Sequence, residues 1–353
     1  MAVAPTHPHS FRIFLSPRAT SAAARGGLVV AAAFGAFALI MILYGKSPLG
    51  ALRDMVSSTL GTSYGLSEVL VKMSPMLLTA VAVTVPARLG LVNVGGEGQM
   101  FIGGLCATWG ALTFKGLLPG WLLIPLMAAL AFAGGGLWGG ITGWMRARGW
   151  LTEVFSTLLL NYIGILLVNF LVFGPWRDPG SGNYPQTKPI PDAAHLPLLG
   201  ETRVHVGIFV GIVAIVLFYL FLKKTRWGLQ MRAAGGNPVA AAQTGLSVAR
   251  YIVIAMVVGG GLAGLAGMTQ VAGIQFRLNP GLTTYVGYTG FLISWLSGHR
   301  PLMIVPMAFL LALLAGGGDI LQITQGVPYA IVNVLVALSL CLILAVRARR
   351  VTS

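Results

Sequence analysis

Long apolar stretches separated by short polar connections run through most of this 353-residue chain. The stretches are about 17 residues or longer, which is the length that an α-helix needs to cross the hydrocarbon core of a bilayer. Because a backbone in hydrocarbon must satisfy its own hydrogen bonds, the stretches are predicted to be helices. The pattern predicts ten spans, of which the second and eighth are the least apolar: 27–45, 70–88, 98–114, 121–144, 151–174, 204–222, 250–273, 283–298, 301–318 and 328–346.

The composition favours the same class. The chain is 56% hydrophobic and only 9% charged, whereas soluble domains carry roughly 25% charged residues. A β-barrel is disfavoured, because barrel strands are short and alternate apolar with polar residues. We therefore expect an all-α fold, a polytopic membrane helical bundle of about ten transmembrane helices. Residues 27–346 would form one transmembrane domain between an N-terminal tail at 1–26 and a short tail at 347–353.

The net charge of +15 predicts an orientation rather than a nucleic-acid partner, since the basic residues are spread over short loops. With both termini in the cytoplasm, fifteen of the 23 lysines and arginines lie on the inner side and eight on the outer side. The larger clusters are all on the inner side, as the positive-inside rule requires. This orientation places residues 223–249 in the cytoplasm.

The segment 223–249 is the longest polar, basic stretch between two apolar runs. Asn237 before Pro238 predicts the start of a short helix, because Asn caps helices and proline is tolerated at the first helical position. Val239 to Thr244 can be helical, and Gly245 can end the helix. A short capped helix after basic residues is suited to docking a partner, and an ordinary solvated loop is the alternative.

A second polar motif, Asn93-Val94-Gly95-Gly96-Glu97-Gly98-Gln99, lies between the second and third spans. Polar side chains at the membrane are costly unless they are paired or face water. The motif is therefore either a capped loop at the cytoplasmic interface or a structured turn that lines a pathway. The amides at membrane depth raise the same alternatives, a path for a neutral solute or contacts between helices; they are Gln99, Asn161, Asn169 and Gln270.

Three weaker patterns describe the surroundings of the spans. The outer stretch 175–203 is rich in Pro and Gly and is not expected to form a domain. Glu68 and Lys72 are four residues apart and could pair on a short interfacial helix. Glycines at helix-packing spacing, such as Gly135 with Gly139 and Gly260 with Gly264, favour packing within the subunit over a dimer interface.

Short patterns that resemble phosphate-binding or metal-binding motifs occur in the chain, but the residues around them do not fit such sites. Gly45-Lys46-Ser47 resembles the end of a phosphate-binding loop, but Ile40 stands where that loop needs glycine. The five histidines show no spacing typical of metal ligands on a helix, and Cys106 and Cys341 lie within apolar runs. We therefore expect no catalytic site and no metal site.

The motif at 91–99 (LVNVGGEGQ) and the segment at 225–246 (TRWGLQMRAAGGNPVAAAQTGL) together make the chain recognisable, along with 152–164 (TEVFSTLLLNYIG) and 316–327 (GGGDILQITQGV). In these stretches the chain resembles the permease subunits of bacterial ABC importers in the branched-chain amino acid, ribose and nucleoside superfamily, most of all the nucleoside and simple-sugar permeases. The resemblance covers roughly residues 65 to 346. Val239 and Ala242 depart from the family, which usually has Glu and Arg there.

The resemblance implies a multi-pass protein of the bacterial inner membrane that does no chemistry and binds no cofactor, because ATP and Mg²⁺ are held by a separate ATPase subunit. The other implied partners are a second permease subunit, with a heterodimer favoured over a homodimer, and a periplasmic or lipid-anchored binding protein. The solute would be a nucleoside or a simple sugar. An ion-coupled secondary transporter is the alternative, disfavoured because Glu97, Glu153 and Asp319 fall near the ends of the predicted spans.

Two sets of residues are expected to carry this function. The set that the resemblance assigns to coupling with the ATPase is Arg226, Gly228, Arg232, Ala233, Gly236, Asn237, Pro238 and Gly245. The set expected along the translocation path is Asn93, Glu97, Gln99, Asn161, Asn169 and Gln270.

Overall fold

A computed structural model of the chain describes residues 22–283, 285–328, 330, 331, 333 and 334. The described part is all-α, as the sequence predicts, with one isolated bridge between Leu198 and His205. Its helices are α1 (Ala22–Leu43), α2 (Pro48–Leu60), α3 (Ser63–Ala87), α4 (Gly96–Thr113), α5 (Gly120–Ala147), α6 (Glu153–Phe173), the 3₁₀ turn η1 (Asp192–Ala194), α7 (Gly207–Lys224), α8 (Arg226–Gly236), α9 (Pro238–Gln243), α10 (Val248–Gln270), the π-helical segment η2 (Val271–Gln275), α11 (Val286–Leu296) and α12 (Pro301–Gln325).

Six helices are long and apolar enough to cross a membrane, and a seventh span results if the bent pair of 34–43 and 48–60 counts as one. The six are α3, α5, α6, α7, α10 with η2, and α12. The predicted span 98–114 forms α4, which is mostly buried within the bundle. The predicted span 283–298 contains only the 11 residues of α11, too few to cross a bilayer. Most of the predicted span 328–346 and the whole tail 347–353 lie outside the described residues, as does most of the tail 1–26.

Two boundaries differ from the prediction for identifiable reasons. The stretch 46–69, expected outside the spans, contains α2 and the first turns of α3, and Ser47 and Thr62 cap these two helices with their hydroxyl groups. The predicted span 301–318 extends to Gln325, because the three glycines at 316–318 continue α12 instead of ending it. Asp319 therefore lies inside this helix, which corrects the expectation that it marks a span end.

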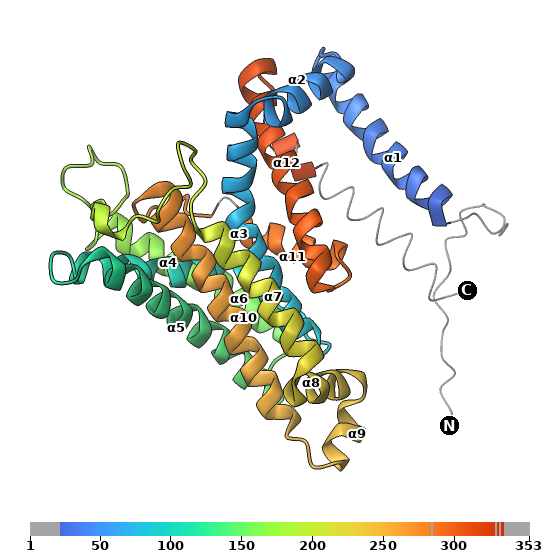
Figure 1. The fold of residues 1–353 in the computed structure, drawn as a ribbon, viewed down its shortest axis with the longest axis vertical. Coiled ribbons are helices and arrows are strands. Elements are labelled where there is room, and N and C mark those ends of the chain that lie inside the picture. Colours follow the sequence, from blue (N-terminus) through green and yellow to red (C-terminus); the bar gives the residue numbers. More distant parts are fainter. Residues whose placement is uncertain (1–21, 284, 329, 332, 335–353) are drawn as a thin grey trace, which may run out of the picture.

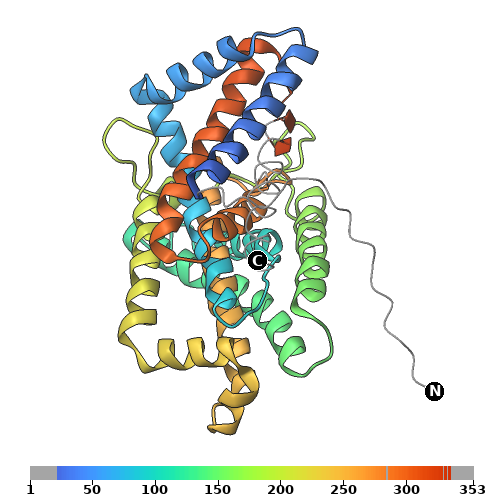
Figure 2. The same cartoon turned by 90° about the vertical axis from the view of Figure 1, so that its right-hand side faces the viewer.

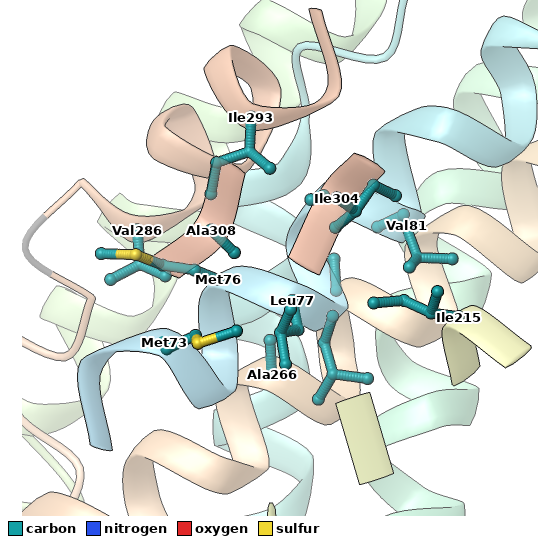
Figure 3. Close-up of a cluster of buried hydrophobic side chains, with 14 of the residues drawn as sticks. Met73, Met76, Leu77, Val81, Ile215, Ala266, Val286, Ile293, Ile304 and Ala308 are labelled. Atoms are coloured by element: carbon teal, nitrogen blue, oxygen red, sulfur yellow. The ribbon is translucent and has the colours of Figure 1, made fainter. Parts of the chain in front are cut away.

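The centre of the bundle is α3, of which 89% of the apolar window is buried, against 28% for α6. Figure 3 shows Met73, Met76 and Leu77 of α3 among side chains from the neighbouring helices, which include Ile215 of α7, Ala266 of α10, Ile293 of α11 and Ile304 of α12. Burial of such side chains on all sides fixes α3 as the element against which the others are placed.

Glycines bring α5 and α10 into close contact. A Cβ atom added at Gly135 would lie 2.3 Å from the carbonyl oxygen of Gly260, and one added at Gly264 would lie 2.1 Å from that of Ala131. Only glycine permits two backbones to approach so closely. The van der Waals contacts that result hold the helices together in lipid, where the hydrophobic effect does not drive helices to associate. The prediction that these glycines pack helices within the subunit is confirmed.

The short helices α8 and α9 lie at one end of the bundle, and α2 and the loop 174–206 lie at the other (Figures 1 and 2). Contacts between residues at the helix ends show which of these ends lie side by side. Arg146 at the end of α5 pairs with Glu153 at the start of α6, and the Arg88 guanidinium after α3 donates to the His299 carbonyl before α12. The loop 174–206 is ordered, because backbone N–H groups of Thr187, Ile190 and Leu196 donate to carbonyls at 272–278.

Candidate functional site

A cavity of about 1060 Å³ opens between α3, η2, α11 and α12, with Tyr162 of α6 at its edge. Its wall mixes apolar side chains such as Met76 and Leu311 with polar groups. The polar and aromatic lining residues are Glu68, Lys72, Tyr162, Arg203, Gln270, Gln275, Thr283, Tyr285, Tyr288, Thr289, Asp319, Gln322 and Asn333. A wall of this kind, mostly preformed and with several convergent polar groups, is typical of a site for a small polar molecule.

Two ion pairs bridge the helices around the cavity. Glu68 pairs with Arg203 at 2.9 Å, and Lys72 pairs with Asp319 at 2.8 Å. The expected pair between Glu68 and Lys72 does not form, because each side chain finds a partner on another element. The two pairs tie α3 to the loop before α7 and to α12. Since all four side chains are partly exposed to the cavity, the pairs also leave its charged wall neutral in sum.

Three tyrosines are the aromatic component of the wall. Tyr285 and Tyr288 lie at the start of α11, with ring centroids 6.2 Å apart, and Tyr162 comes from α6. Their rings can stack on a flat or weakly polar face of a solute, and their hydroxyl groups can donate to it. The sequence analysis missed them, because aromatic residues are common in apolar spans and only the fold brings these three together.

The motif at 93–99 lies beneath this wall rather than on it. Asn93 and Gln99 are fully buried and exchange two hydrogen bonds of 3.1 and 3.2 Å through their side-chain amides. The Asn93 side-chain oxygen also accepts from the backbone N–H of Gly95 at 3.0 Å. Two buried amides that satisfy each other rigidify the turn that leads into α4.

Glu97 connects the motif to α11. Its carboxylate accepts from the backbone N–H of Gly287 at 2.7 Å and from the Thr283 hydroxyl. The side chain is only 3% exposed, so these contacts replace water around the charge. Because Thr283 lines the cavity and Gly287 lies in the first turn of α11, Glu97 acts on the wall from behind it.

Asn161 of α6 joins the same network. Its side-chain oxygen accepts from the Gly98 N–H at 2.7 Å, and its side-chain nitrogen donates to the Val94 carbonyl at 2.8 Å and to the Tyr288 hydroxyl at 3.3 Å. One fully buried amide therefore fixes the turn before α4 and a tyrosine of the cavity. The stretch 152–164 contributes further support, since Glu153 and Thr157 accept from the N–H groups of Val92 and Val94.

The structure thus separates the six residues expected along a path. Gln270 lines the cavity. Asn93, Glu97, Gln99 and Asn161 form the buried network behind its wall. Asn169, two turns further along α6, does not line it, and its side-chain oxygen is buried without a hydrogen-bond partner among the described residues.

The segment 223–249 folds into two short helices (Figures 1 and 2). The predicted helix is confirmed as α9: the Asn237 side chain accepts from the Ala240 N–H at 3.0 Å, and Gly245 ends it at a φ of +84°. The preceding helix α8 was not predicted. Its signal is Thr225, whose hydroxyl accepts from the Gly228 N–H at 3.0 Å, a capping pattern that stands directly after the basic residues.

The residues expected to couple with a partner lie mainly on the exposed face of α8 and α9. Gly228 is buried, because a Cβ atom there would lie 2.3 Å from the carbonyl oxygen of Phe221. The exposed members are Arg226, Arg232, Ala233, Gly236, Asn237, Pro238 and Gly245. Leu229 and Val239 are 61% and 67% exposed beside them. Exposed apolar side chains among basic ones at the end of a bundle are typical of a protein-binding surface.

Three arginines meet where α8 packs on the bundle. Burial lowers the pKa of the Arg88 guanidinium, and the charges of Arg232 and Arg300 lower it further. Gly235 packs directly on the backbone of Arg88, since a Cβ atom there would lie 2.0 Å from its carbonyl oxygen. The contact joins α8 to the end of α3, the central helix, so a displacement of α8 would be transmitted to the cavity-lining helix.

Comparisons with known proteins indicate one family of transport proteins. The family model for the permease component of branched-chain amino acid transport systems matches residues 65–346. A glucose ABC transporter permease protein of Haloferax volcanii is 34% identical, over 88% of this chain and 84% of its own length. A guanosine ABC transporter permease protein of Bacillus subtilis is 32% identical over 85% of this chain and 87% of its own length. A nucleoside ABC transporter permease protein of Lactococcus lactis is 31% identical over 85% and 84%.

Proposed function

Because the chain belongs to the family of permease components of branched-chain amino acid transport systems, we propose that it forms the solute path of an ATP-driven ABC importer. The solute is a nucleoside or a simple sugar, as the names of the similar permeases indicate for those proteins. A member of this family is a multi-pass membrane protein and a transport subunit rather than an enzyme.

The cavity of about 1060 Å³ is the observation that carries the proposal. It lies in a bundle of apolar helices, and its wall offers tyrosines, amides and hydroxyl groups while its charges are paired. Such a wall suits a neutral solute with several hydroxyl groups, because it can exchange the solute's hydrogen bonds with water for bonds to the protein.

Within this path, Gln270 contacts the solute from the cavity wall. Asn93, Glu97, Gln99 and Asn161 hold the wall in place through their buried hydrogen bonds. Asn169 is proposed to belong to the same path on a different level of α6, where its buried side-chain oxygen has no hydrogen-bond partner among the described residues. These roles are part of the proposal and are supported by the positions of the side chains.

The helices α8 and α9 are proposed to receive the ATPase. Arg226, Arg232, Ala233, Gly236, Asn237, Pro238 and Gly245 form the exposed contact, and Gly228 lets α8 pack closely on the end of α7. Val239 and Ala242 make the contact more apolar than in the family. ATP and Mg²⁺ belong to the ATPase, so this chain needs no cofactor of its own.

In the proposed topology both termini lie in the cytoplasm of a bacterium, and the chain lies in the inner membrane. Residues 27–346 form the permease domain between cytoplasmic tails at 1–26 and 347–353. The end of the bundle with α8 and α9 then faces the cytoplasm, and the loop 174–206 faces outward (Figure 1). A second permease subunit, in a heterodimer rather than a homodimer, and a periplasmic or lipid-anchored binding protein complete the transporter.

Copurification with the ATPase tests the proposal. The chain is expressed together with the ATPase subunit of the transporter, and residues 226–246 are replaced by a Gly/Ser linker of equal length. The control replaces residues 179–184, most of them exposed, at the opposite end of the bundle. We expect the ATPase to be lost from the first variant and retained by the control.

Uptake of radiolabelled guanosine and of radiolabelled glucose by cells identifies the solute class and the energy source. We expect uptake of one of the two to stop when the ATPase is deleted. Continued uptake in cells that lack the ATPase would contradict an ABC importer and would favour an ion-coupled transporter.

A further inference from the structure

Helix α11 begins inside the bundle, and its first turn is capped by a side chain from another helix. Its own N-cap residue, Tyr285, makes no capping hydrogen bond with its side chain. The first N–H groups of a helix need partners from elsewhere. Glu97 of α4 supplies one: its carboxylate accepts from Gly287 at 2.7 Å, and the backbone N–H groups of Tyr285 and Tyr288 also interact with it.

Two helices start at this carboxylate. Glu97 lies in the first turn of α4, and the start of α11 is so close that a Cβ atom at Gly287 would lie 2.3 Å from the Glu97 nitrogen. The N-terminal ends of both helices carry partial positive charge, and these ends repel each other at short range. A carboxylate between them offsets that repulsion, and no described lysine or arginine forms an ion pair with Glu97.

The backbone of Tyr285 indicates that this junction is held under constraint. Tyr285 has a φ of +66°, in the left-handed region that non-glycine residues seldom adopt. Such a conformation persists only where the surroundings hold it. Here it directs an aromatic ring, 61% exposed, to the cavity beside Tyr288.

We propose that Glu97 is a positioning residue, whose carboxyl oxygens accept from the first N–H groups of α11 and thereby hold Tyr285 and Tyr288 at the cavity wall. The carboxylate does not contact the solute in this role. The capping stands on the geometry alone, whereas its consequence for transport rests on the proposed function.

Hydrogen exchange of the purified full-length protein in lipid nanodiscs tests the capping. In the Glu97→Gln variant the side chain keeps its size, and an NH2 donor replaces one of its two acceptor oxygens. We expect the amide hydrogens of residues 285–290 to exchange at least about tenfold faster, because one amide oxygen cannot accept from both Gly287 and Thr283. Exchange in α12 should stay as in the unchanged protein.

Glu153→Gln is the matched control. Glu153 is also a buried carboxylate, 8% exposed, but it accepts from the Val92 N–H and pairs with Arg146. Its replacement should speed exchange near residue 92 and leave 285–290 unchanged. Equal exchange at 285–290 in Glu97→Gln and the unchanged protein would overturn the proposal. An equal acceleration at 285–290 in Glu153→Gln would overturn it too, since that reports general loosening.

A milder variant decides the question if Glu97→Gln does not fold. Thr283→Val removes only the hydroxyl that donates to the carboxylate. It should speed exchange at 285–290 about threefold, and unchanged exchange there would contradict the proposal. Glu97→Asp keeps both acceptor oxygens on a shorter side chain, so its exchange should lie between that of the unchanged protein and that of Glu97→Gln.

Uptake by the assembled transporter tests the consequence for transport separately. We expect Glu97→Gln to lower the maximal rate about tenfold, per molecule in the membrane, because the tyrosines are no longer held at the wall. Faster exchange with unchanged uptake would overturn the transport role. Absence of ATP-dependent uptake by the unchanged protein would instead refute the proposed function, and the exchange result would stand.

Discussion

The buried motif at 93–99 and the exposed segment at 225–246 use the same chemistry for different ends. Both are rich in glycine, and in both a side-chain oxygen accepts from N–H groups at a helix start. Asn237 and Thr225 cap the helices that follow them in the chain. Glu97 instead caps α11, which begins 189 residues later in the sequence with Val286.

The difference separates a local from a long-range use of capping. The caps of α8 and α9 define an exposed surface that is complete within about 20 residues. The capping by Glu97 joins α4 to α11, and Asn161 joins α6 to both, around one cavity. A change in the exposed segment should therefore have a small, confined effect, and a change in the buried network should have a large effect that spreads to the cavity.

The largest contrast is expected from one methyl group placed in each region. In Gly98→Ala the added carbon would lie 2.7 Å from the Cα of Asn161, so α4 and α6 must separate, and we expect a loss of about 3 kcal/mol of stability. In Gly236→Ala the carbon meets nothing within 4 Å. Thermal unfolding of both proteins in detergent measures the contrast, and similar midpoints would break the comparison.

The next largest effect is expected at Asn161. Asn161→Leu removes the partners of the Gly98 N–H and the Val94 carbonyl, and two buried backbone groups without partners should lower stability by about 2 kcal/mol. Asn169→Leu on the same helix removes an amide whose oxygen has no described partner, so its stability should change little. Uptake should fall in Asn161→Leu. If uptake and affinity stayed unchanged in Asn161→Ala, Asn161 would serve only as a contact between helices.

A pH effect tests a buried group with a local contact. Burial lowers the pKa of His205 from 6.5 to about 4, and its Nδ1 accepts from the Gly207 N–H at 3.2 Å. The unfolded chain binds a proton first as pH falls below 6.5, so stability should drop by roughly 1 kcal/mol on going from neutral pH to about pH 5.5. His205→Gln should remove this part of the pH dependence, and an unchanged profile would contradict it.

The smallest effect is expected at the exposed cap. Asn237→Ala removes the side-chain acceptor of the Ala240 N–H, and loss of such a cap costs about 1 kcal/mol of helix stability. Because α9 is short and exposed, we expect no change in the unfolding midpoint of the bundle and a few-fold weaker copurification with the ATPase. Asn237→Ser retains a capping oxygen and should copurify normally. Equal loss in both variants would show that the amide itself contacts the partner.

What could be predicted from the sequence follows the same division. Helix α9 was predicted because Asn237, Pro238 and Gly245 act on residues next to them. Most spans were predicted because lipid requires long apolar runs. The family itself was recognised from short motifs, and its model matches the same residues, 65–346.

Helix α8 was missed although its cap, Thr225, is local, but three other misses involve partners distant in sequence. Glu68 and Lys72 are suitably spaced to pair, but Arg203 and Asp319 compete successfully for them. The end of α12 was placed too early. A charged residue such as Asp319 indicates the end of an apolar span, but here its charge is paired with Lys72. The tyrosines of the cavity carry no local signal, because Tyr162 comes from α6 whereas Tyr285 and Tyr288 come from the start of α11.

The π-helical segment η2 makes the cavity wall sensitive to the loss of a single residue. A π turn holds one residue more than an α turn, and such turns commonly occur at functional sites. A single-codon deletion within 271–274 would restore α-helical register and rotate Gln275 by about 100° around the helix axis, away from the carbonyls of Gly281 and Leu282 to which it donates. One codon within η2 is thus enough to reshape the wall of the cavity while every other helix keeps its sequence.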